Sequence, residues 1–271
     1  MKTKQLDEQA VILASTDSQG VLRLTLNNSA RRNALSETML TQLHCAMTDA
    51  ATDTSVRVIV LAATGPVFCA GHDLKELTAG RNNKDNGQAY FTKIMRLCST
   101  LMQAIVNNPK PVIAEVSGIA TAAGCQLVAS CDLAYAQETT QFSTPGVNIG
   151  LFCSTPMVAL SRNVASKHAL EMLLTGDMIS AHRAAEIGLI NAVTTADNLT
   201  SKVMEVAMKI AAKSSGTLAI GKRAFYQQQE MSLSEAYVFS AEVMVGNMLT
   251  QDAEEGINAF IEKRMPTWSD Q

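Results

Sequence analysis

The sequence predicts an α/β fold with an all-helical C-terminal region, and three observations lead to this prediction. Short apolar runs rich in valine, isoleucine and leucine alternate with segments in which apolar residues recur at helical spacing. Hydrophobic residues make up 47% of the 271-residue chain, enough to bury a sizeable core. The strand signals stop near residue 197, and only helical patterns follow. We therefore expect an α/β core at residues 1–196 and a helical region at residues 197–271.

The N-terminal half alternates between strand and helix signals. Two β-prone runs at residues 10–16 and 21–26 flank the turn-forming tetrapeptide DSQG, so a hairpin is expected to open the fold. Ser36 has the side chain of a helix N-cap, and the apolar residues after it recur at helical spacing. The further elements expected in this half are a strand at 56–63, a helix at 87–106, a strand at 111–116, a helix at 122–130 and a strand at 132–136.

The second half begins with a loop at residues 140–155 and then becomes mainly helical. Thr155 followed by Pro156 is typical of an N-cap with proline at the first helical position. Two helices, at 166–176 and 180–188, are each expected to end at a glycine. Further helices are expected up to about 213, at 217–228, from Ser232 with a capping box to Glu235, and over 252–264.

Charge and composition argue against several classes of function. The net charge of −3 provides no basic field that would attract nucleic acid or an anionic membrane. The six cysteines lack CxxC spacing and the four histidines lie far apart, so neither a metal site nor a disulfide framework is predicted. The first ten residues, MKTKQLDEQA, lack the apolar segment of a secretion signal and carry acidic residues atypical of a transit peptide. No apolar run reaches membrane-spanning length. We expect a soluble cytoplasmic protein without a nucleic-acid, membrane or metal partner.

Two stretches of small residues are candidates for chemistry. In ATAAGCQLVASCD (residues 120–132), six small residues precede Gln126, and small residues at a helix start let an anionic oxygen approach the free N–H groups. Tight packing against a neighbouring strand is the alternative reading. GPVFCAGHDLKEL (residues 65–77) has the same character after a buried strand. Two such turns, each giving one N–H to the same oxygen, would meet the requirement for an oxyanion hole.

The motifs FCAGHDLKEL and VSGIATAAGCQLVASCD, followed by SAHRAAEIGLI and GINAFIEKR, resemble the crotonase (enoyl-CoA hydratase/isomerase) superfamily over nearly the whole chain. Within it, the sequence is most similar to the branch called enoyl-CoA hydratase domain-containing protein 3. The resemblance implies a spiral of ββα repeats with a C-terminal helical region that builds homotrimers or dimers of trimers. It also implies binding of acyl-CoA thioesters, with coenzyme A as part of the substrate and no separate cofactor.

The resemblance also implies roles for individual residues. The oxyanion-hole donors fall on the backbone N–H groups of His72 and Ala123; family members usually have glycine at the second position. The candidate residues for binding substrate or CoA are Asn33, Ala34, Ala70, His72, Asp73, Leu74, Lys75, Ala123, Phe260 and Lys263. For Phe260 and Lys263, which match a terminal segment that reaches the adenine of a neighbouring subunit, packing between subunits is the alternative.

The acid and base groups of a hydratase are missing. The resemblance places its two glutamates at Gln126 and Gly146, and the acid of dienoyl-CoA isomerases at Ser154. A carboxamide does not exchange protons near neutral pH and glycine has no side chain, and loss of one such group costs roughly 10²–10⁴-fold in rate. Efficient hydration by the usual route is therefore not expected.

Other polar residues near the motifs leave alternatives open. The His72 ring either takes part in chemistry, as its neutral-range pKa allows, or only its N–H functions. Cys125 and Cys153 are expected to be buried small side chains, and Asp132 to pair or cap structurally. Thr144 and Asn148 are candidates to position a water molecule. The sequence alone does not set the register of this loop.

Three functional hypotheses follow. The first is an acyl-CoA enzyme that needs an oxyanion hole but no glutamate pair, such as a decarboxylase or thioesterase. The second is a weak or narrow hydratase or isomerase. The third is a noncatalytic acyl-CoA-binding protein. RNA binding, which is known for some relatives, is disfavoured by the net charge.

Overall fold

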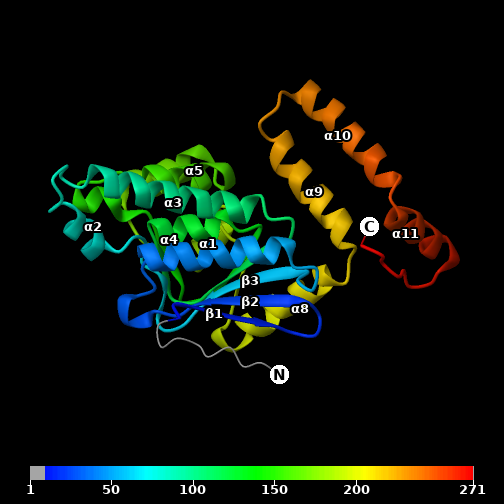
Figure 1. The fold of residues 1–271 in the computed structure, drawn as a ribbon, viewed down its shortest axis with the longest axis horizontal. Helices are drawn as coiled ribbons and strands as arrows, with labels where there is room; N and C mark the ends of the chain where they lie inside the picture. The colour runs from blue at the N-terminus through cyan, green and yellow to red at the C-terminus, as the bar shows by residue number, and fades with distance from the viewer. Residues whose placement is uncertain (1–9, 271) are drawn as a thin grey trace.

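The computed structural model describes residues 10–270 and contains two β-sheets with helices around them (Figure 1). The larger sheet has six strands in the order β1-β2-β3-β5-β7-β10. Its strands are β1 (Ile12–Thr16), β2 (Val21–Leu26), β3 (Val58–Ala63), β5 (Val112–Val116), β7 (Leu133–Gln137) and β10 (Ala192–Thr194). The β1–β2 pair is the expected antiparallel hairpin, and all later pairs in this sheet are parallel. The α/β fold class is confirmed.

The smaller sheet contains four short strands in the order β4-β6-β8-β9. They are β4 (Val67–Cys69), β6 (Ile119–Thr121), β8 (Gln141–Ser143) and β9 (Ile179–Ser180). The pairs β4–β6 and β6–β8 are parallel, so the carboxyl ends of these three strands lie at one edge. The sequence motifs of interest come directly after β4 and β6.

Helices connect the strands and then form the C-terminal region. The α-helices are α1 (Glu37–Thr52), α2 (Leu74–Gly80), α3 (Gln88–Val106), α4 (Ala123–Ser130), α5 (Ser154–Asn163), α6 (Ser166–Thr175), α7 (Ala181–Glu186), α8 (Leu199–Ala211), α9 (Ser215–Gln228), α10 (Leu233–Met248) and α11 (Gln251–Glu262). The 3-10 helices are η1 (Ser29–Arg31), η2 (Pro145–Ile149) and η3 (Ala196–Asn198). No strand lies between residue 197 and residue 270, as expected.

Strand β3 shows how the larger sheet is buried on both faces. Because side chains alternate along a strand, Ile59 and Leu61 face the main core with α1 and α3, whereas Val58 and Val60 face the other side. That second face is covered by α8, which lies on the opposite side of the sheet from α1 (Figure 1). The α8 helix therefore packs on the sheet, and the domain boundary at residues 196 and 197 stays a prediction.

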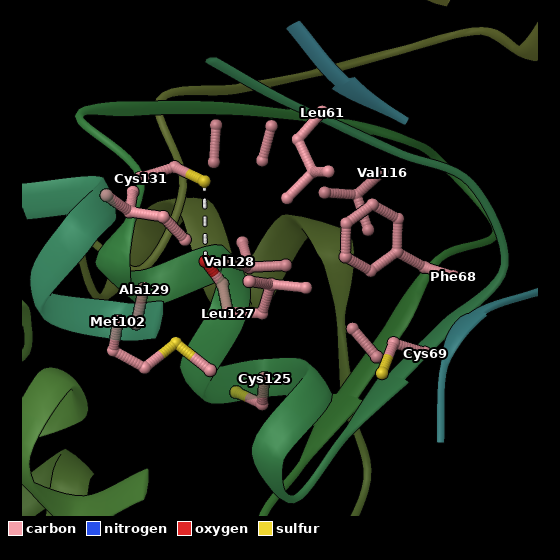
Figure 2. Packing of buried hydrophobic residues seen from close by; sticks show 14 of the residues in the cluster. Leu61, Phe68, Cys69, Met102, Val116, Cys125, Leu127, Val128, Ala129 and Cys131 are labelled. Atoms are coloured by element: carbon pink, nitrogen blue, oxygen red, sulfur yellow. Dashed lines mark hydrogen bonds between the residues drawn. The ribbon is translucent and has the colours of Figure 1, made fainter. Parts of the chain in front are cut away.

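Helix α4 lies deep in the main core. Every residue from Ala123 to Ser130 is buried. Figure 2 shows Leu127, Val128 and Ala129 of this helix among Phe68, Val116 and Met102. Figure 2 also marks the hydrogen bond that the Cys131 thiol donates to the Leu127 carbonyl over 3.3 Å. A helix with this environment has little freedom to move, so its N-terminus is a rigid platform.

The expected caps are largely confirmed. Ser36 accepts the Met39 N–H at 3.1 Å, and Ser232 and Glu235 form a capping box. Gly176 ends α6 in the left-handed conformation. The expected cap at Thr155 is wrong, because α5 begins at Ser154 after the N-cap residue Cys153, which places the proline within the first turn instead of at its first position.

The C-terminal helices α9 and α10 extend beyond the α/β core as a projecting hairpin (Figure 1). We call residues 215–262 the C-terminal arm. Its exposed large apolar side chains include Leu233, Tyr237, Leu249 and Phe260. The tail after the arm returns to its base, where the Trp268 indole N–H donates to the Ala212 carbonyl at 2.9 Å. None of the helices in residues 10–270 is long and apolar enough to cross a membrane.

Candidate active site

The two turns singled out in the sequence touch each other. Strands β4 and β6 run side by side, with Cys69 paired to Ala120, so Gly71 and Ala123 follow at the same sheet edge. Gly71 has a φ of +86°, and a β-carbon there would lie 2.9 Å from the Ala122 β-carbon and 3.3 Å from the Ala123 nitrogen. Glycine is therefore required at 71 both by conformation and by space. The turns at Gly71 and Ala123, about fifty positions apart in the sequence, therefore form one site.

Ala122 holds the start of α4 in a strained conformation. Its φ of 51° and ψ of −120° are uncommon for a residue with a β-carbon. No side chain in the described part of the chain caps this N-terminus, and as the first helical residue Ala123 has an N–H without an acceptor inside the helix. Gly124 lets the helix approach β4, because a β-carbon there would lie 2.1 Å from the Cys69 carbonyl oxygen. Close packing and an available N–H, the two readings of the small residues, therefore occur together.

His72 stands opposite this helix start. It forms an isolated bridge with Leu35, whose N–H donates to the Gly71 carbonyl at 2.8 Å. No acceptor for the His72 N–H is found among residues 10–270. Both ring nitrogens are buried without a hydrogen-bond partner. Burial lowers the pKa of the ring, with the nearby Leu35 backbone partly opposing the shift, so the neutral imidazole is favoured.

The loop before α1 is tied to this turn by Asn33. This side chain is completely buried and donates to the Thr64 and Val67 carbonyls at 2.9 and 2.8 Å, while its oxygen accepts the Asn28 N–H at 2.8 Å. Ala34 is also buried. The predicted CoA contact of Asn33 therefore cannot use its side-chain amide donors, both of which are engaged; the side chain positions the loop instead.

The segment after His72 divides into a fixed and an exposed part. The Asp73 carboxylate caps α2 by accepting the Lys75 N–H at 2.9 Å, and it pairs with Arg31 at 3.0 Å. Burial alone would raise the pKa of Asp73, but its hydrogen bonds from Glu76, Arg31 and Lys75 together hold it below the usual value. Leu74 and Lys75 are exposed, and Ala70 is partly buried. The predicted contacts of these residues with CoA stay predictions.

The positions of the missing acids differ in their surroundings. Gln126 lies on the first turn of α4, is 4% exposed, and its side-chain oxygen is buried without a partner. Gly146 lies in η2, where a β-carbon would approach the Cys153 Sγ and the Leu151 carbonyl oxygen, each to 2.9 Å. Position 126 could hold a glutamate, because its place on α4 matches that of the family's first glutamate. Position 146 has no room for a side chain unless the loop shifts. Ser154, on α5, is exposed.

Two buried hydroxyls join the site from β8. Ser143 accepts the Ala122 N–H through its carbonyl at 2.9 Å, and its hydroxyl and that of the next residue, Thr144, are both buried without partners. The sequence did not point to Ser143, and Asn148, which was a candidate together with Thr144, is exposed. A serine and threonine directly after an apolar Phe142 were the only signal. Placing them required the three-residue strand β8 to be recognised.

The remaining candidates behave as expected from their chemistry. Cys125 and Cys153 are buried, and burial raises the pKa of the Cys125 thiol to about 12, so neither is an activated nucleophile. Asp132 forms a half-buried structural cluster: its carboxylate accepts the Val112 N–H at 2.7 Å and pairs with Lys222 of α9 at 2.7 Å. Among residues 10–270, no group of three or more His, Cys, Asp or Glu side chains is arranged to hold a metal ion.

A cavity of about 1080 Å³ lies between α3, α4, α5 and α9. Gln126 lines it, whereas His72, Ala123 and Thr144 do not, so this cavity meets the candidate site at Gln126. Its walls include Met102 of α3 and Val158 of α5. There is therefore space for a substituent on the far side of Gln126.

Phe260 and Lys263 are not brought to this site within one chain. Phe260 is 85% exposed on α11, and Lys263 ends that helix in the left-handed conformation. Helix α11 lies at the opposite side of the molecule from α2 (Figure 1). A contact of either residue with CoA bound at the candidate site therefore requires a second subunit.

Comparison with known proteins assigns the chain. The family model for enoyl-CoA hydratase/isomerase matches residues 16–271. The chain belongs to the enoyl-CoA hydratase/isomerase family. The rat protein named enoyl-CoA hydratase domain-containing protein 3, mitochondrial, is 48% identical over 258 residues, covering 95% of this chain and 84% of the relative. The predicted superfamily and branch are confirmed.

Two further members of the family extend the comparison. The crystal structure of the human enoyl-CoA hydratase domain-containing protein 3 matches with a TM-score of 0.90 and 45% identity, covering 95% of this chain and all of that chain (100%). This confirms the crotonase fold. The Escherichia coli protein named 2,3-dehydroadipyl-CoA hydratase is 35% identical over 249 residues, covering 92% of this chain and 94% of the relative.

This comparison contradicts the predicted cytoplasmic location. The rat, mouse, frog and human relatives are all named as mitochondrial proteins. The prediction rested on reduced cysteines and on the residues at the start of the sequence. Free thiols indicate a reducing environment and do not distinguish the cytoplasm from another reducing compartment.

Proposed function

We propose that the protein binds acyl-CoA thioesters and polarises the thioester carbonyl between the N–H groups of His72 and Ala123. The observation that carries this proposal is the contact between the two turns, in which the β-carbon position of Gly71 lies 3.3 Å from the Ala123 nitrogen. Donors fixed at the start of a buried helix and in a turn that is bridged to Leu35 need no rearrangement when charge develops on the carbonyl oxygen. Each donor is expected to contribute roughly 10²–10³-fold to a rate limited by such charge.

The chemistry that follows carbonyl polarisation does not use a glutamate pair. Gln126 neither accepts nor donates a proton at neutral pH, and the backbone of Leu151 closes the space beside Gly146. Hydration needs a base that deprotonates the attacking water and an acid that protonates the α-carbon, and a double-bond shift needs a base that removes a proton from carbon. Both reactions are therefore expected to be slow. The activity in the family name is retained for this chain only as a weak side reaction.

Decarboxylation of a β-carboxyacyl-CoA is the reaction that best suits these groups. The bond between Cα and the carboxylate breaks, carbon dioxide leaves, and the electron pair forms an enolate whose oxygen lies between the two N–H groups. A proton from solvent then completes the acyl-CoA product. The specific observation in favour is that two unpartnered hydroxyls, those of Ser143 and Thr144, lie on residues next to Ala122, while the Asp73 carboxylate is engaged by the start of α2. Thioester hydrolysis and ligand binding without turnover are the competing functions.

Carbonyl polarisation is tested with acetyl-CoA labelled with ¹³C at the carbonyl carbon. Binding is expected to move the carbonyl resonance downfield, because hydrogen bonds to the oxygen withdraw electron density from the carbon. Ala123→Pro, which deletes one N–H, should reduce this shift, whereas His72→Ala retains its N–H and should not. A bound ligand with an unshifted resonance would reject the oxyanion hole.

Turnover is tested separately across malonyl-, crotonyl- and 3-hydroxybutyryl-CoA by mass spectrometry of the products. Conversion of malonyl-CoA to acetyl-CoA supports decarboxylation, and release of free CoA from several esters supports hydrolysis. Rapid hydration of crotonyl-CoA would contradict our reading of Gln126 and Gly146. Tight binding with no product from any ester would support the noncatalytic function.

We also propose that the C-terminal arm assembles the protein into homotrimers or dimers of trimers. Large apolar side chains such as Leu233, Tyr237 and Leu249 stand exposed on α10 and the turn after it. Clusters of this kind mark association surfaces. Light scattering should give a mass three or six times that of one chain, and Leu249→Glu should lower it. A monomeric wild-type protein would reject this assembly.

A further inference from the structure

Four residues of the described chain hold every buried side-chain nitrogen or oxygen that lacks a hydrogen-bond partner. They are His72, through both ring nitrogens, and Gln126, Ser143 and Thr144, through one oxygen each. Buried polar atoms are nearly always paired, so each exception requires an explanation. Because the exceptions are confined to these four residues, the explanation is sought in the place they share.

All four residues lie around Ala122. The Ala122 N–H donates to the Ser143 carbonyl at 2.9 Å, and the Ala122 carbonyl accepts the Gln126 N–H at 3.1 Å. Thr144 follows Ser143 directly, and the turn containing His72 contacts Ala122 through Gly71. Backbone contacts therefore bring the four residues that carry the unpartnered atoms together at the N-terminus of α4, beside the proposed carbonyl site.

The groups in this region are suited to an anion. The unpartnered hydroxyls of Ser143 and Thr144 can each donate a hydrogen bond. The Gln126 amide can donate only through its nitrogen, because its unpartnered buried oxygen is an acceptor. Gln126, Ser143 and Thr144 are 4%, 0% and 1% exposed. The nearby carboxylate of Asp73 is already engaged by Arg31 and by N–H groups of α2. The positive end of the α4 dipole adds to this preference. A pair of glutamates here would repel an anionic substrate, and this chain has neither.

We propose that Gln126, Ser143 and Thr144 form a subsite for a carboxylate carried by the acyl group, close to its thioester carbonyl. The substrate class is thereby a β-carboxyacyl-CoA of the malonyl type. This inference rests on the proposed function, because the carboxylate reaches the subsite only when the thioester lies between His72 and Ala123. A carboxylate has up to four lone-pair directions, which can accept hydrogen bonds from the two hydroxyls and the amide nitrogen of these residues. A methyl group in the same place would leave these donors unpaired.

The inference is tested by calorimetry with malonyl-CoA, acetyl-CoA and butyryl-CoA, the last being an uncharged acyl group of similar size. Wild-type protein is expected to bind malonyl-CoA about tenfold or more tightly than either other ester, as hydrogen bonds to a charged group allow. Product analysis in the same cell detects any acetyl-CoA formed.

Three variants test which residues cause the preference for malonyl-CoA over the uncharged esters. Gln126→Glu places a negative charge beside the carboxylate and should abolish the preference for malonyl-CoA while retaining acetyl-CoA binding. Thr144→Val should reduce the preference several-fold. Thr140→Val is the matched control, because Thr140 is equally buried at the other end of β8 but its hydroxyl already donates to the Val116 carbonyl at 3.1 Å. It should leave the preference unchanged.

The outcomes separate this inference from the proposed function. If none of the three esters binds the folded wild-type protein, the proposed function fails. If all three bind alike, acyl-CoA binding stands and the carboxylate subsite is rejected in favour of a water site. If Gln126→Glu does not fold, Thr144→Val and a further variant, Ser143→Ala, decide: an unchanged preference for malonyl-CoA in both rejects the subsite.

Discussion

The two ends of α4 both bury polar side chains, but only one end satisfies them. After the C-terminal end, the Asp132 carboxylate accepts hydrogen bonds from Val112 at 2.7 Å and Tyr226 at 2.9 Å, and pairs with Lys222. At the N-terminal end, Gln126 has a buried oxygen without a partner. A satisfied buried group supports structure, whereas an unsatisfied one costs stability and indicates a ligand. Substitutions at the two ends should therefore affect different properties.

The largest effect is expected at the satisfied end. Besides pairing with Asp132, the Lys222 ammonium donates to the Ile105 and Lys110 carbonyls at 3.0 and 3.1 Å. Burial lowers the pKa of Lys222 and raises that of Asp132, with their mutual attraction opposing both shifts. Lys222→Met leaves the half-buried carboxylate without its cation and should reduce the free energy of unfolding by about 3 kcal/mol in urea denaturation, the low end of the range for buried pairs.

The double variant with Asp132→Asn controls for this effect. Removing both charges avoids a buried unpaired carboxylate, so the double variant should lose less stability than Lys222→Met alone. A loss below about 1 kcal/mol in the single variant would show that solvent reaches Asp132, and would contradict the structural role assigned to this cluster.

Two threonines on either side of β8 provide the sharpest contrast. Thr140 and Thr144 are both buried, but only the Thr140 hydroxyl has a partner. Thr140→Val should destabilise the protein by about 1–2 kcal/mol, because it leaves the Val116 carbonyl with one hydrogen bond fewer. Thr144→Val should be neutral or stabilising by up to about 1 kcal/mol, because it removes an unsatisfied hydroxyl. Thermal unfolding of both variants measures the difference.

Stability changes of opposite sign in Thr140→Val and Thr144→Val would confirm that the unpartnered group at the N-terminal end of α4 lowers the stability of the unliganded protein. Equal destabilisation would mean that Thr144 has a structural partner after all, and the case for a ligand at this hydroxyl would be lost. Because the two substitutions are chemically identical, changes in the unfolded chain largely cancel in the comparison.

A smaller gain is expected from relieving the strain at Ala122. Its φ of 51° is one that glycine adopts without cost. Ala122→Gly should stabilise the protein by about 1 kcal/mol, the strain released exceeding the added entropy of the unfolded chain. Gly246→Ala, within α10 and with nothing near its β-carbon position, is a control that should stabilise by about 0.5–1 kcal/mol through helix propensity alone. A destabilised Ala122→Gly variant would show that the methyl group, and not the strain, dominates at this turn.

The helix caps were predictable from sequence and the strands beside the site were not, for a physical reason. The caps at Ser36, Ser232 and Gly176 depend on residues close together in the chain, and were predictable. The strands β6 and β8 have three residues each, too few to show a period-two pattern, and their pairing joins distant segments. Ser143 was therefore missed, although the small residues around Ala123 were identified.

Two details of the site depend on tertiary contacts that no local pattern contains. The absence of room at Gly146 arises because the chain returns at Leu151 and Cys153. The role of Asn33 as a clamp arises because its amide meets the ends of β3 and β4. The resemblance to a family located both residues at the site, but only the structure shows what each side chain does there.

The smallest predicted effect concerns pH and the His72 ring. Burial lowers the pKa of this ring from its model-compound value of 6.5. As the pH falls below about 6.5, the unfolded chain binds a proton at this position before the folded protein does, so folding stability should decrease. The decrease should cease below the folded-state pKa, where both states are protonated. His72→Gln should remove this component from the pH dependence of the unfolding free energy.

A bound carboxylate would reverse this behaviour, because a negative charge beside the ring favours the imidazolium form. At a pH between the pKa of the ring in the free folded protein and its higher pKa in the complex, binding of malonyl-CoA should therefore take up a proton. Binding of butyryl-CoA should not. Calorimetry at pH 6 in buffers of different ionisation enthalpy measures this uptake directly. Proton uptake with malonyl-CoA that is absent in His72→Gln would place the carboxylate beside the imidazole and tie the open end of α4 to its ligand. Equal uptake with both esters would instead assign the proton to the CoA part and separate His72 from the acyl group.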